Sequence, residues 1–402
     1  MASAQRPTVL PGIDVLAQES FEPVRGARVG IVAGAASVDA GLTSTIDRLL
    51  AAEGVEVAAL FGAEHGLRGE AQAGVHVADT VDPETGLPVY SLYGERRRPR
   101  ADALAGLDAL VIDLVDVGCR YWTFPYTMAY CLQAAAEAGI RAVVLDRPNP
   151  ITGVRVEGNI LDPAFSSFVG LYPVPIRTGL TMGEAARLFN DAFGIGADLH
   201  VVPCRGWRRS MWYDETGLPF VPPSPNAPSL EMLTLYPGTC LVEGTNVSEG
   251  RGTTRPFETV GAPWINPKRL ARRLAERGLP GVAFRPVYFT PSFQKHAGEV
   301  CGGVQIHILD RAAVHAVRVG LHLLHALIAE SGSEFAWRAP AAGGRRMIDL
   351  LAGTDRLRLH LDAGGDPDEL LSEWEAALPS FAPLAERARL YPAEDSPADS
   401  PV

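Results

Sequence analysis

The chain has 402 residues, of which 47% are hydrophobic and 21% are charged, and these proportions are typical of a globular protein with a sizeable core. This length favours two domains. The formal net charge of -11 leaves no basic footprint for nucleic acid, and no apolar run is long enough to cross a bilayer. We therefore expect neither nucleic acid nor a membrane as a partner.

Short apolar runs alternate with helical patterns through the first half of the chain. In chain order, the pattern predicts a strand at 28–33, a helix at 43–52, strands at 55–61 and 109–114, a helix at 125–138, a strand at 141–145, a helix at 181–193 and a strand at 199–203. The helix at 181–193 opens with Thr181-Met-Gly-Glu184, which has the spacing of a capping box. Continuous Val, Ile and Leu strands between helices indicate a doubly wound, mainly parallel α/β sheet with helices on both faces.

A proline-dense stretch at 219–228 is typical of a rigid connector and predicts a domain boundary. We predict an N-terminal α/β domain at 8–230, a C-terminal α/β domain at 231–392 and a disordered tail at 393–402. In the second domain, the patterns predict strands at 282–289 and 303–309 and helices at 312–329, 345–351 and 368–377.

Five cysteines are scattered along the chain without CxxC spacing. An odd number in this arrangement is typical of reduced thiols, and not of a disulfide framework or a zinc site. The N-terminal residues lack the apolar run of a signal peptide. Together these features predict a cytoplasmic protein.

Three polar clusters, at 62–69, 115–121 and 146–150, each follow a predicted strand. Ligands bind outside the carboxyl ends of the strands in such sheets, so we expect these loops to share one edge. They contain several candidate site residues: Glu64, His65, Arg68, Asp116, Arg120, Tyr121, Arg147 and Asn149.

A glycine-rich loop at 241–257 is too polar to be a core element. It combines carboxylates, an amide and a guanidinium, at Glu243, Asn246, Glu249 and Arg251. Its glycines allow the backbone to approach a ligand closely, so the loop suits a polyhydroxylated or anionic small molecule. A solvated loop with ordinary turn chemistry is the alternative.

Several familiar catalytic motifs are absent from the sequence. It contains neither GxGxxG nor a P-loop, and it lacks HExxH and the GxSxG nucleophile elbow. We therefore expect no cofactor and no metal. Glu64-His65, with His76 nearby, leaves a metal-dependent amidase or deacetylase as an alternative.

Carboxylate chemistry is the remaining hypothesis. Two carboxylates in different environments can serve as a general acid and as a base or nucleophile. Glu64, which follows an apolar strand, is the candidate acid. For each candidate carboxylate, the alternative is a structural ion pair with a nearby arginine, which we favour for Asp146 and Arg147. Arginines can also clamp an anionic substrate bidentately. The candidates are Arg68, Arg120, Arg147, Arg177 and Arg251, whereas the basic run at 96–100 is predicted to be a solvated loop.

Longer motifs show that the chain resembles the NamZ-like family of exo-β-N-acetylmuramidases. They occur in family order over roughly residues 12–390: Gly62-Ala-Glu-His-Gly66, Ser91-Leu-Tyr-Gly94, Asp116-Val-Gly-Cys-Arg120, Val144-Leu-Asp-Arg-Pro-Asn-Pro150, Ser224-Pro-Asn226, Tyr236-Pro-Gly238 and Glu243-Gly-Thr-Asn-Val-Ser-Glu-Gly-Arg-Gly-Thr253. The resemblance implies a Rossmann-like N-terminal domain, a smaller C-terminal α/β domain and an active site in the cleft between them. It also implies release of N-acetylmuramic acid from the non-reducing end of peptidoglycan fragments, in cell-wall turnover and recycling.

The resemblance also implies roles for individual residues. Glu64 is the expected catalytic acid, and Glu249 and Asp116 are candidates for the second catalytic group. The lactyl carboxylate of muramic acid explains an arginine-rich site in a protein that takes a muropeptide or disaccharide as substrate. The expected substrate-binding residues are His65, Arg68, Arg120, Tyr121, Arg147, Asn149, Arg177, Asn226, Glu243, Asn246 and Arg251.

Three positions depart from the family pattern. This chain has Val115 where the family has glutamine, Thr178 where it has histidine, and Gln133 where it has an acid. If these positions contact the substrate, the chain binds cell-wall sugars without turnover or prefers a different sugar. This is the second hypothesis.

Overall fold

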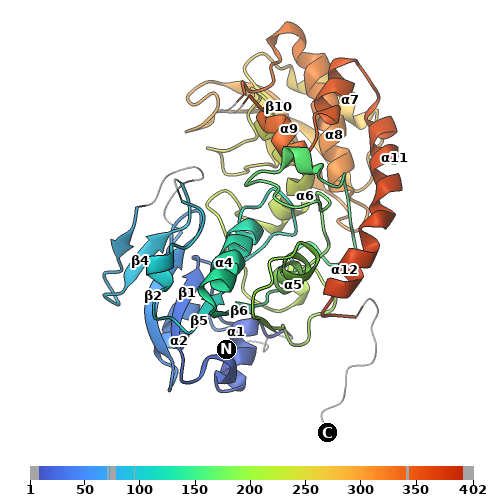
Figure 1. The fold of residues 1–402 in the computed structure, drawn as a ribbon. Coiled ribbons are helices and arrows are strands. Elements are labelled where there is room, and N and C mark those ends of the chain that lie inside the picture. Colours follow the sequence, from blue (N-terminus) through green and yellow to red (C-terminus); the bar gives the residue numbers. More distant parts are fainter. Residues whose placement is uncertain (1–8, 70–71, 73–77, 95, 341–343, 393–402) are drawn as a thin grey trace, which may run out of the picture.

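The computed structural model describes residues 9–69, 72, 78–94, 96–340 and 344–392. The chain forms two units that lie one above the other in Figure 1. We call them the N-terminal unit, which carries a seven-stranded sheet, and the C-terminal unit, which carries a three-stranded sheet. The predicted tail at 393–402 lies outside the described residues, and the predicted boundary at residue 230 stays a prediction.

The sheet of the N-terminal unit has the strand order β3-β4-β2-β1-β5-β6-β7. Its strands are β1 (Arg28–Ala33), β2 (Glu56–Gly62), β3 (Thr80–Val81), β4 (Pro88–Ser91), β5 (Ala109–Ile112), β6 (Arg141–Leu145) and β7 (Leu199–Val202). All neighbouring strands are parallel except β3 and β4. The prediction of a mainly parallel sheet is therefore confirmed.

Helices cover both faces of this sheet, which explains why its central strands are apolar throughout. Helices α1 (Gly12–Gln18) and α2 (Thr45–Leu50) pack on one face, and α4 (Phe124–Ala138) and α5 (Met182–Ala192) pack on the other. A short helix, α3 (Ala101–Leu104), contacts α4. Helix α5 begins at the predicted capping box, in which the side chain of each partner accepts the backbone N–H of the other.

The C-terminal unit has an antiparallel sheet in the order β8-β10-β9. Its strands are β8 (Thr259–Ala262), β9 (Val282–Phe289) and β10 (Cys301–Ile308). Its helices are α6 (Leu230–Thr239), α7 (Pro267–Ala275), α8 (Ala316–Ser331), α9 (Met347–Ala352), α10 (Arg356–Asp362) and α11 (Pro367–Ala377). Among the described residues, every helix is too short or too polar to pass through a bilayer.

Helices α6 and α8 cross at two glycines. A Cβ on Gly238 would lie 1.9 Å from the carbonyl oxygen of Ala316, and one on Gly320 would lie 2.3 Å from the carbonyl oxygen of Gly238. Only glycine allows the two backbones to come this close. The long helix predicted at 312–329 begins later than expected, because His315 caps it by accepting the N–H of Arg318.

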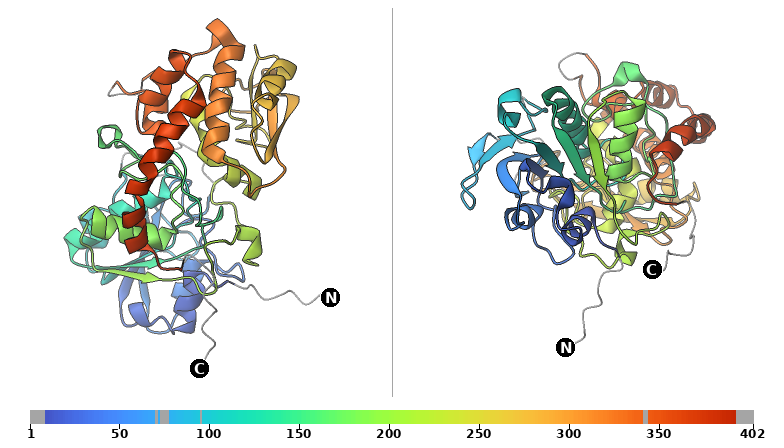
Figure 2. Two further views of the ribbon diagram at one scale, coloured as in Figure 1. Left: turned by 90° about the vertical axis from the view of Figure 1, so that its right-hand side faces the viewer. Right: turned by 60° about the horizontal axis from the view of Figure 1, so that its bottom comes forward.

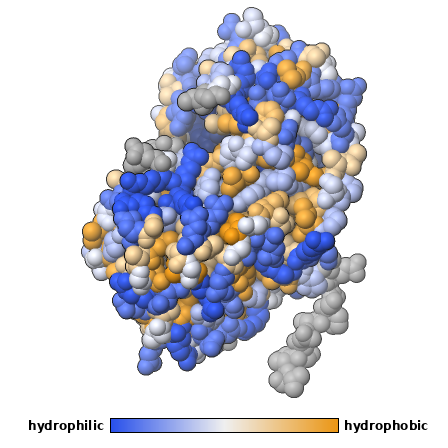
Figure 3. Space-filling view, viewed as in Figure 1, coloured by the Kyte–Doolittle hydropathy of each residue, from blue (hydrophilic) through white to orange (hydrophobic). Residues whose placement is uncertain are grey.

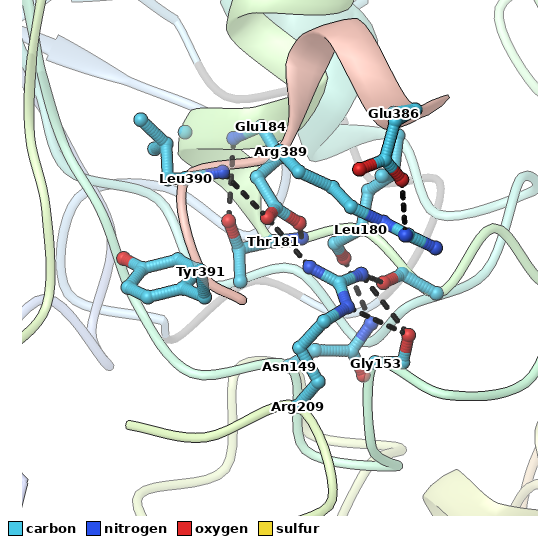
Figure 4. A network of polar contacts seen from close by, with 12 residues as sticks. Asn149, Gly153, Leu180, Thr181, Glu184, Arg209, Glu386, Arg389, Leu390 and Tyr391 are labelled. Atoms are coloured by element: carbon cyan, nitrogen blue, oxygen red, sulfur yellow. Dashed lines mark hydrogen bonds and ion pairs between the residues drawn. The ribbon is translucent and has the colours of Figure 1, made fainter. Parts of the chain in front are cut away.

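The C-terminal segment returns to the N-terminal unit. Helices α11 and α12 (Ala382–Ala388) run down the side of both units, and α12 packs on α5 (Figure 2). Beyond α12, the N–H of Leu390 donates to Glu184 Oε1 at 3.0 Å, and Arg209 Nη1 lies 2.6 Å from the same oxygen (Figure 4). The hydroxyl of Tyr391 donates to Asp146 Oδ2 at 2.6 Å. Buried polar contacts therefore attach the end of the chain to the sheet.

We expect the variant Tyr391→Phe to be less stable than the wild type by about 1–3 kcal/mol, because it leaves buried partners unsatisfied. The lost hydroxyl also accepts the N–H of Cys204 at 2.8 Å. Urea unfolding followed by circular dichroism measures the difference. Tyr288 is 74% exposed, so Tyr288→Phe is the matched control. Equal effects of the two substitutions would contradict this account of the anchor.

Candidate active site

A cavity of about 600 Å³ lies between the two units. In the space-filling view it corresponds to a hollow bordered by hydrophilic residues (Figure 3). Its charged and aromatic lining residues include Glu64, Arg97, Glu243, Arg251, Arg338, Tyr93, Tyr121, Tyr236 and Phe168. A concave site of this size with a few converging polar groups suits a small molecule with both hydroxyl and charged groups.

Glu64 reaches this cavity from the carboxyl end of β2. A tight turn follows the strand, in which the N–H of Gly66 donates to the carbonyl oxygen of Ala63 at 3.1 Å. The hydroxyl of Thr123, just before α4, donates to Glu64 Oε2 at 2.7 Å. The hydroxyl of Tyr93 also hydrogen-bonds to Glu64, and burial, followed by the negative charge of Glu64, raises the pKa of Tyr93. Two hydroxyl groups from different loops therefore orient this carboxyl group.

On the C-terminal side, a chain of alternating charges forms the cavity wall. Arg251 Nη2 lies 2.7 Å from Glu243 Oε1, and its Nη1 lies 3.0 Å from Glu249 Oε1. Glu249 is 3% exposed and does not line the cavity, whereas Glu243 and Arg251 do. The Nζ of Lys295 lies 2.9 Å from Glu249 Oε2. Burial alone would raise the pKa of Glu249, but Lys295 and Arg251 hold it below its usual value.

Lys295 also fastens the loop that carries Glu243. It lies between β9 and β10, and its Nζ donates to the carbonyl oxygens of Val242 at 3.1 Å and Val247 at 2.9 Å. A single lysine in a loop belongs to no motif, so the sequence analysis did not select it. Its role depends on partners that only the fold brings to it.

Asn246 fixes a neighbouring segment. Its Nδ2 donates to the carbonyl oxygen of Glu334 at 2.8 Å, and its Oδ1 accepts the N–H of Ala336 at 3.0 Å. The N–H of Arg338 in turn donates to the carbonyl oxygen of Gly244 at 2.8 Å. Asn246 was expected to bind substrate, but its amide contacts this backbone, and it does not line the cavity.

Arg120 connects the two units. It is 2% exposed, and its guanidinium donates to the carbonyl oxygens of Val174 at 2.8 Å and of Ala352 at 2.8 Å. The second contact lies in the C-terminal unit. The hydroxyl of Tyr121, which lines the cavity, donates across the same boundary to the carbonyl oxygen of Pro237 at 2.6 Å.

Three other predicted arginines form ion pairs away from the cavity lining. The pairs are Arg147 with Asp113 at 2.5 Å, Arg177 with Glu157 at 2.6 Å and Arg68 with Asp82 at 2.7 Å. The first two pairs are almost completely buried. Structural ion pairs were the expected alternative for carboxylates with nearby arginines, and these three arginines form such pairs. The pair expected between Asp146 and Arg147 was wrong, because the guanidinium of Arg147 binds Asp113 instead.

The remaining predicted residues have other surroundings. Asp116 is buried and accepts the N–H of Val117 at 2.7 Å, and burial raises the pKa of Asp116 to about 7. The amide of Asn149 donates to the carbonyl oxygen of Leu180 at 2.8 Å, and that of Asn226 donates to Gln72 at 3.3 Å. Neither Asp116 nor the two asparagines line the cavity.

His65 is buried next to Glu64 and has a left-handed backbone with φ of 76°. It lines a smaller space between the turn after β2 and the loop after β1, at Gly34. Within the described part of the chain, no three His, Cys, Asp or Glu side chains are grouped closely enough to hold a metal ion. His76, which belonged to the metal hypothesis, lies outside the described residues.

The three departures from the family pattern are not among the described cavity-lining residues. The amide of Gln133 donates to the hydroxyl of Tyr172 at 3.3 Å. The hydroxyl of Thr178 accepts the N–H of Leu180 at 3.2 Å, and Val115 accepts from an indole through its carbonyl oxygen. None of the three side chains therefore forms part of the wall of this cavity.

Sequence reasoning missed several lining residues. Tyr93 lies inside the family motif at 91–94, and this motif was the one signal that pointed to it. Arg97 belongs to the basic run that was predicted to be a solvated loop; its guanidinium lies 4.2 Å from the ring centroid of Phe168 and also lines the cavity. Thr123 and Arg338 carried no local signal.

We expect Lys295→Met to destabilise the protein by about 3–5 kcal/mol, because it leaves a buried carboxylate without one of its partners. The folded pKa of Glu249 is lowered, so its contribution is complete above the unfolded value of about 4.3 and is lost as the pH falls through the folded value. The difference in the free energy of unfolding between the variant and the wild type should therefore become smaller at acidic pH. Denaturant unfolding at several pH values measures it.

The chain's second lysine provides the control. Lys268 is exposed on α7, so Lys268→Met should change the free energy of unfolding by less than about 0.5 kcal/mol. A similar small change for Lys295→Met would show that the buried charge chain does not stabilise the loop.

Comparison with known proteins identifies the family of the chain. Family models for the N-terminal and C-terminal domains of exo-β-N-acetylmuramidase NamZ match residues 29–231 and 234–391. The chain is 43% identical over 389 residues to the peptidoglycan β-N-acetylmuramidase NamZ of Bacillus subtilis (strain 168). The matched region covers 97% of this chain and 93% of that protein.

Two crystal structures of DUF1343 family proteins from Bacteroides fragilis NCTC 9343 have the same two-unit fold. The first has a TM-score of 0.88 at 35% identity and covers 96% of this chain and 100% of its own. The second has a TM-score of 0.77 at 29% identity and covers 96% of this chain and 99% of its own. The chain therefore belongs to the exo-β-N-acetylmuramidase NamZ family.

Proposed function

We propose that the cavity between the two units binds the terminal N-acetylmuramic acid of a peptidoglycan fragment and hydrolyses its glycosidic bond. The chain is a glycosidase of the NamZ family, and the B. subtilis relative is named as a peptidoglycan β-N-acetylmuramidase. The observation that carries the assignment of the site is Glu64, a carboxyl group oriented by two hydroxyls in the wall of a polar cavity.

Glu64 is the proposed general acid. It donates a proton to the glycosidic oxygen while the bond from that oxygen to the anomeric carbon breaks. Thr123 and Tyr93 hold the carboxyl group in one orientation. The acid is therefore already oriented when the substrate binds, which lowers the entropic cost of proton transfer. Positive charge develops on the sugar ring at the same time.

We propose that Glu243 is the carboxylate that stabilises this positive charge. Glu249 and Asp116, the earlier candidates, do not line the cavity, whereas Glu243 does so from the opposite unit. Its ion pair with Arg251 at 2.7 Å holds the carboxylate in one orientation. A carboxylate in this position can stabilise an oxocarbenium-like transition state or accept a proton from the attacking water.

A cytoplasmic role in cell-wall recycling is part of the same proposal. All five cysteines are free and buried, which supports a reducing compartment. The substrate we propose is therefore a muropeptide or disaccharide that has already been released from the wall.

We expect Glu64→Gln to lower the hydrolysis of a chromogenic β-N-acetylmuraminide by about 100-fold to 10,000-fold, because the amide cannot donate the proton. Binding of N-acetylmuramic acid, measured by calorimetry, should persist. The exposed Glu53, in the turn before the amino end of β2, provides the control variant Glu53→Gln, which should keep full turnover. Full activity of Glu64→Gln would exclude this residue as the acid.

Substrate choice is tested with the matching β-N-acetylglucosaminide. We expect the wild type to hydrolyse the muraminide in preference, because the cavity contains cationic side chains that suit a carboxylate. Turnover of the glucosaminide alone would show that the substrate is a glucosaminide and not a muraminide. Sugar binding without turnover of either compound would favour the binding protein that the three departures suggested.

A further inference from the structure

Among the described residues, three arginines line the cavity, and they differ in whether a carboxylate pairs with them. Arg251 lies between two carboxylates and is held by both. Arg97 and Arg338 are exposed, and within the described part of the chain neither has an ion-pair partner. A guanidinium that faces a cavity without a counterion is a ready site for an anionic group of a ligand.

Arg97 lies on the same side of the cavity as the proposed acid. Its guanidinium packs over the ring of Phe168, at 4.2 Å from the centroid. Its positive charge acts on the hydroxyl of Tyr93, which in turn bonds to Glu64. An anion held by Arg97 would therefore lie close to the bond that is cleaved.

Arg338 belongs to the opposite wall. Its N–H donates to the carbonyl oxygen of Gly244, the residue that follows Glu243. Asn246 holds the preceding residues through two side-chain hydrogen bonds. The positive charge of Arg338 is felt by Lys295, whose pKa is lowered by burial and by this charge. The backbone of Arg338 is therefore fixed, and its guanidinium is available to the cavity.

The chemistry of muramic acid distinguishes between these two arginines. Its lactyl carboxylate hangs from the oxygen on C3, whereas the bond to be cleaved starts at C1, and the acetamido group on C2 lies between them. The receptor for the carboxylate can therefore be separate from the acid. Of the two arginines that lack a carboxylate partner among the described residues, Arg338 is the one on the wall opposite Glu64.

We propose that Arg338 binds the lactyl carboxylate and makes the site select muramic acid over glucosamine, an inference that rests on the proposed function of the cavity. The glucosamine analogue lacks the lactyl arm and leaves the guanidinium without a partner. Asn246 acts as a positioning residue, because it fixes the segment from which Arg338 projects. Specificity then comes from a residue that is separate from the catalytic carboxylates.

The test uses calorimetry of the intact protein with N-acetylmuramic acid and N-acetylglucosamine as separate ligands. We expect Arg338→Gln to weaken binding of N-acetylmuramic acid by about tenfold or more, since hydrogen bonds between charged groups are lost. Its affinity for N-acetylglucosamine should change by less than about twofold. Arg97→Gln is the matched control, because it removes an exposed cavity arginine on the other wall and should leave the ratio of the two affinities unchanged.

Turnover provides a second readout. In Arg338→Gln, kcat/KM should fall for the chromogenic muraminide, mainly through KM, and should be unchanged for the glucosaminide. Asn246→Ala should also lower kcat/KM for the muraminide relative to kcat/KM for the glucosaminide. A loss of folded protein would lower both values equally.

Three results would overturn the inference. The first is an unchanged muramic acid to glucosamine ratio in Arg338→Gln, and the second is loss of that ratio in Arg97→Gln. The third is a wild type that neither binds nor hydrolyses the muramic compounds, which overturns the proposed function as well. If the wild type binds N-acetylmuramic acid without turnover, only the catalytic proposal fails. The calorimetric measurements then still decide whether Arg338 binds the lactyl carboxylate.

Discussion

The wall of the cavity depends on a buried chain of charges that runs from Glu243 through Arg251 and Glu249 to Lys295. Each buried ion is costly to remove from water, so the chain is stable only when every member has its partner. Lys295 also bonds to backbone carbonyl groups of the loop that carries Glu243. One set of interactions therefore holds a glycine-rich loop in a single conformation and leaves a paired carboxylate facing the cavity.

The cavity exists because the two units are held against each other. Arg120 and Tyr121 donate from the N-terminal unit to carbonyl groups of the C-terminal unit. The segment after α12 then returns to the N-terminal unit, where Tyr391 bonds to Asp146 at the carboxyl end of β6. These contacts hold Glu64 on one unit in a constant relation to Glu243 on the other. In the proposed mechanism, neither unit alone carries both carboxyl groups.

The arginines illustrate how one residue type serves two purposes. Arg120, Arg147 and Arg177 are buried and satisfied by carboxylates or backbone carbonyls, so they stabilise the fold. Arg97 and Arg338 are exposed at the cavity, where a ligand can complete their interactions. The difference between the two groups is the presence of a partner, and partners are supplied by the tertiary structure. A count of arginines in polar loops therefore could not separate them.

The sequence by itself determined the elements whose patterns are local. The strands at 28–33, 141–145 and 282–289 and the capping box at Thr181 follow from periodicity and from spacings of a few residues. It also indicated Glu64, because a polar residue after an apolar strand lies at the binding edge of a parallel sheet. Helix α6 was missed because Pro237 and Gly238 look like helix breakers, although the glycine serves contact with α8. Only the tertiary structure decided that Lys295 pairs with Glu249 and that Arg338 faces the cavity, since these relations join residues far apart in the chain.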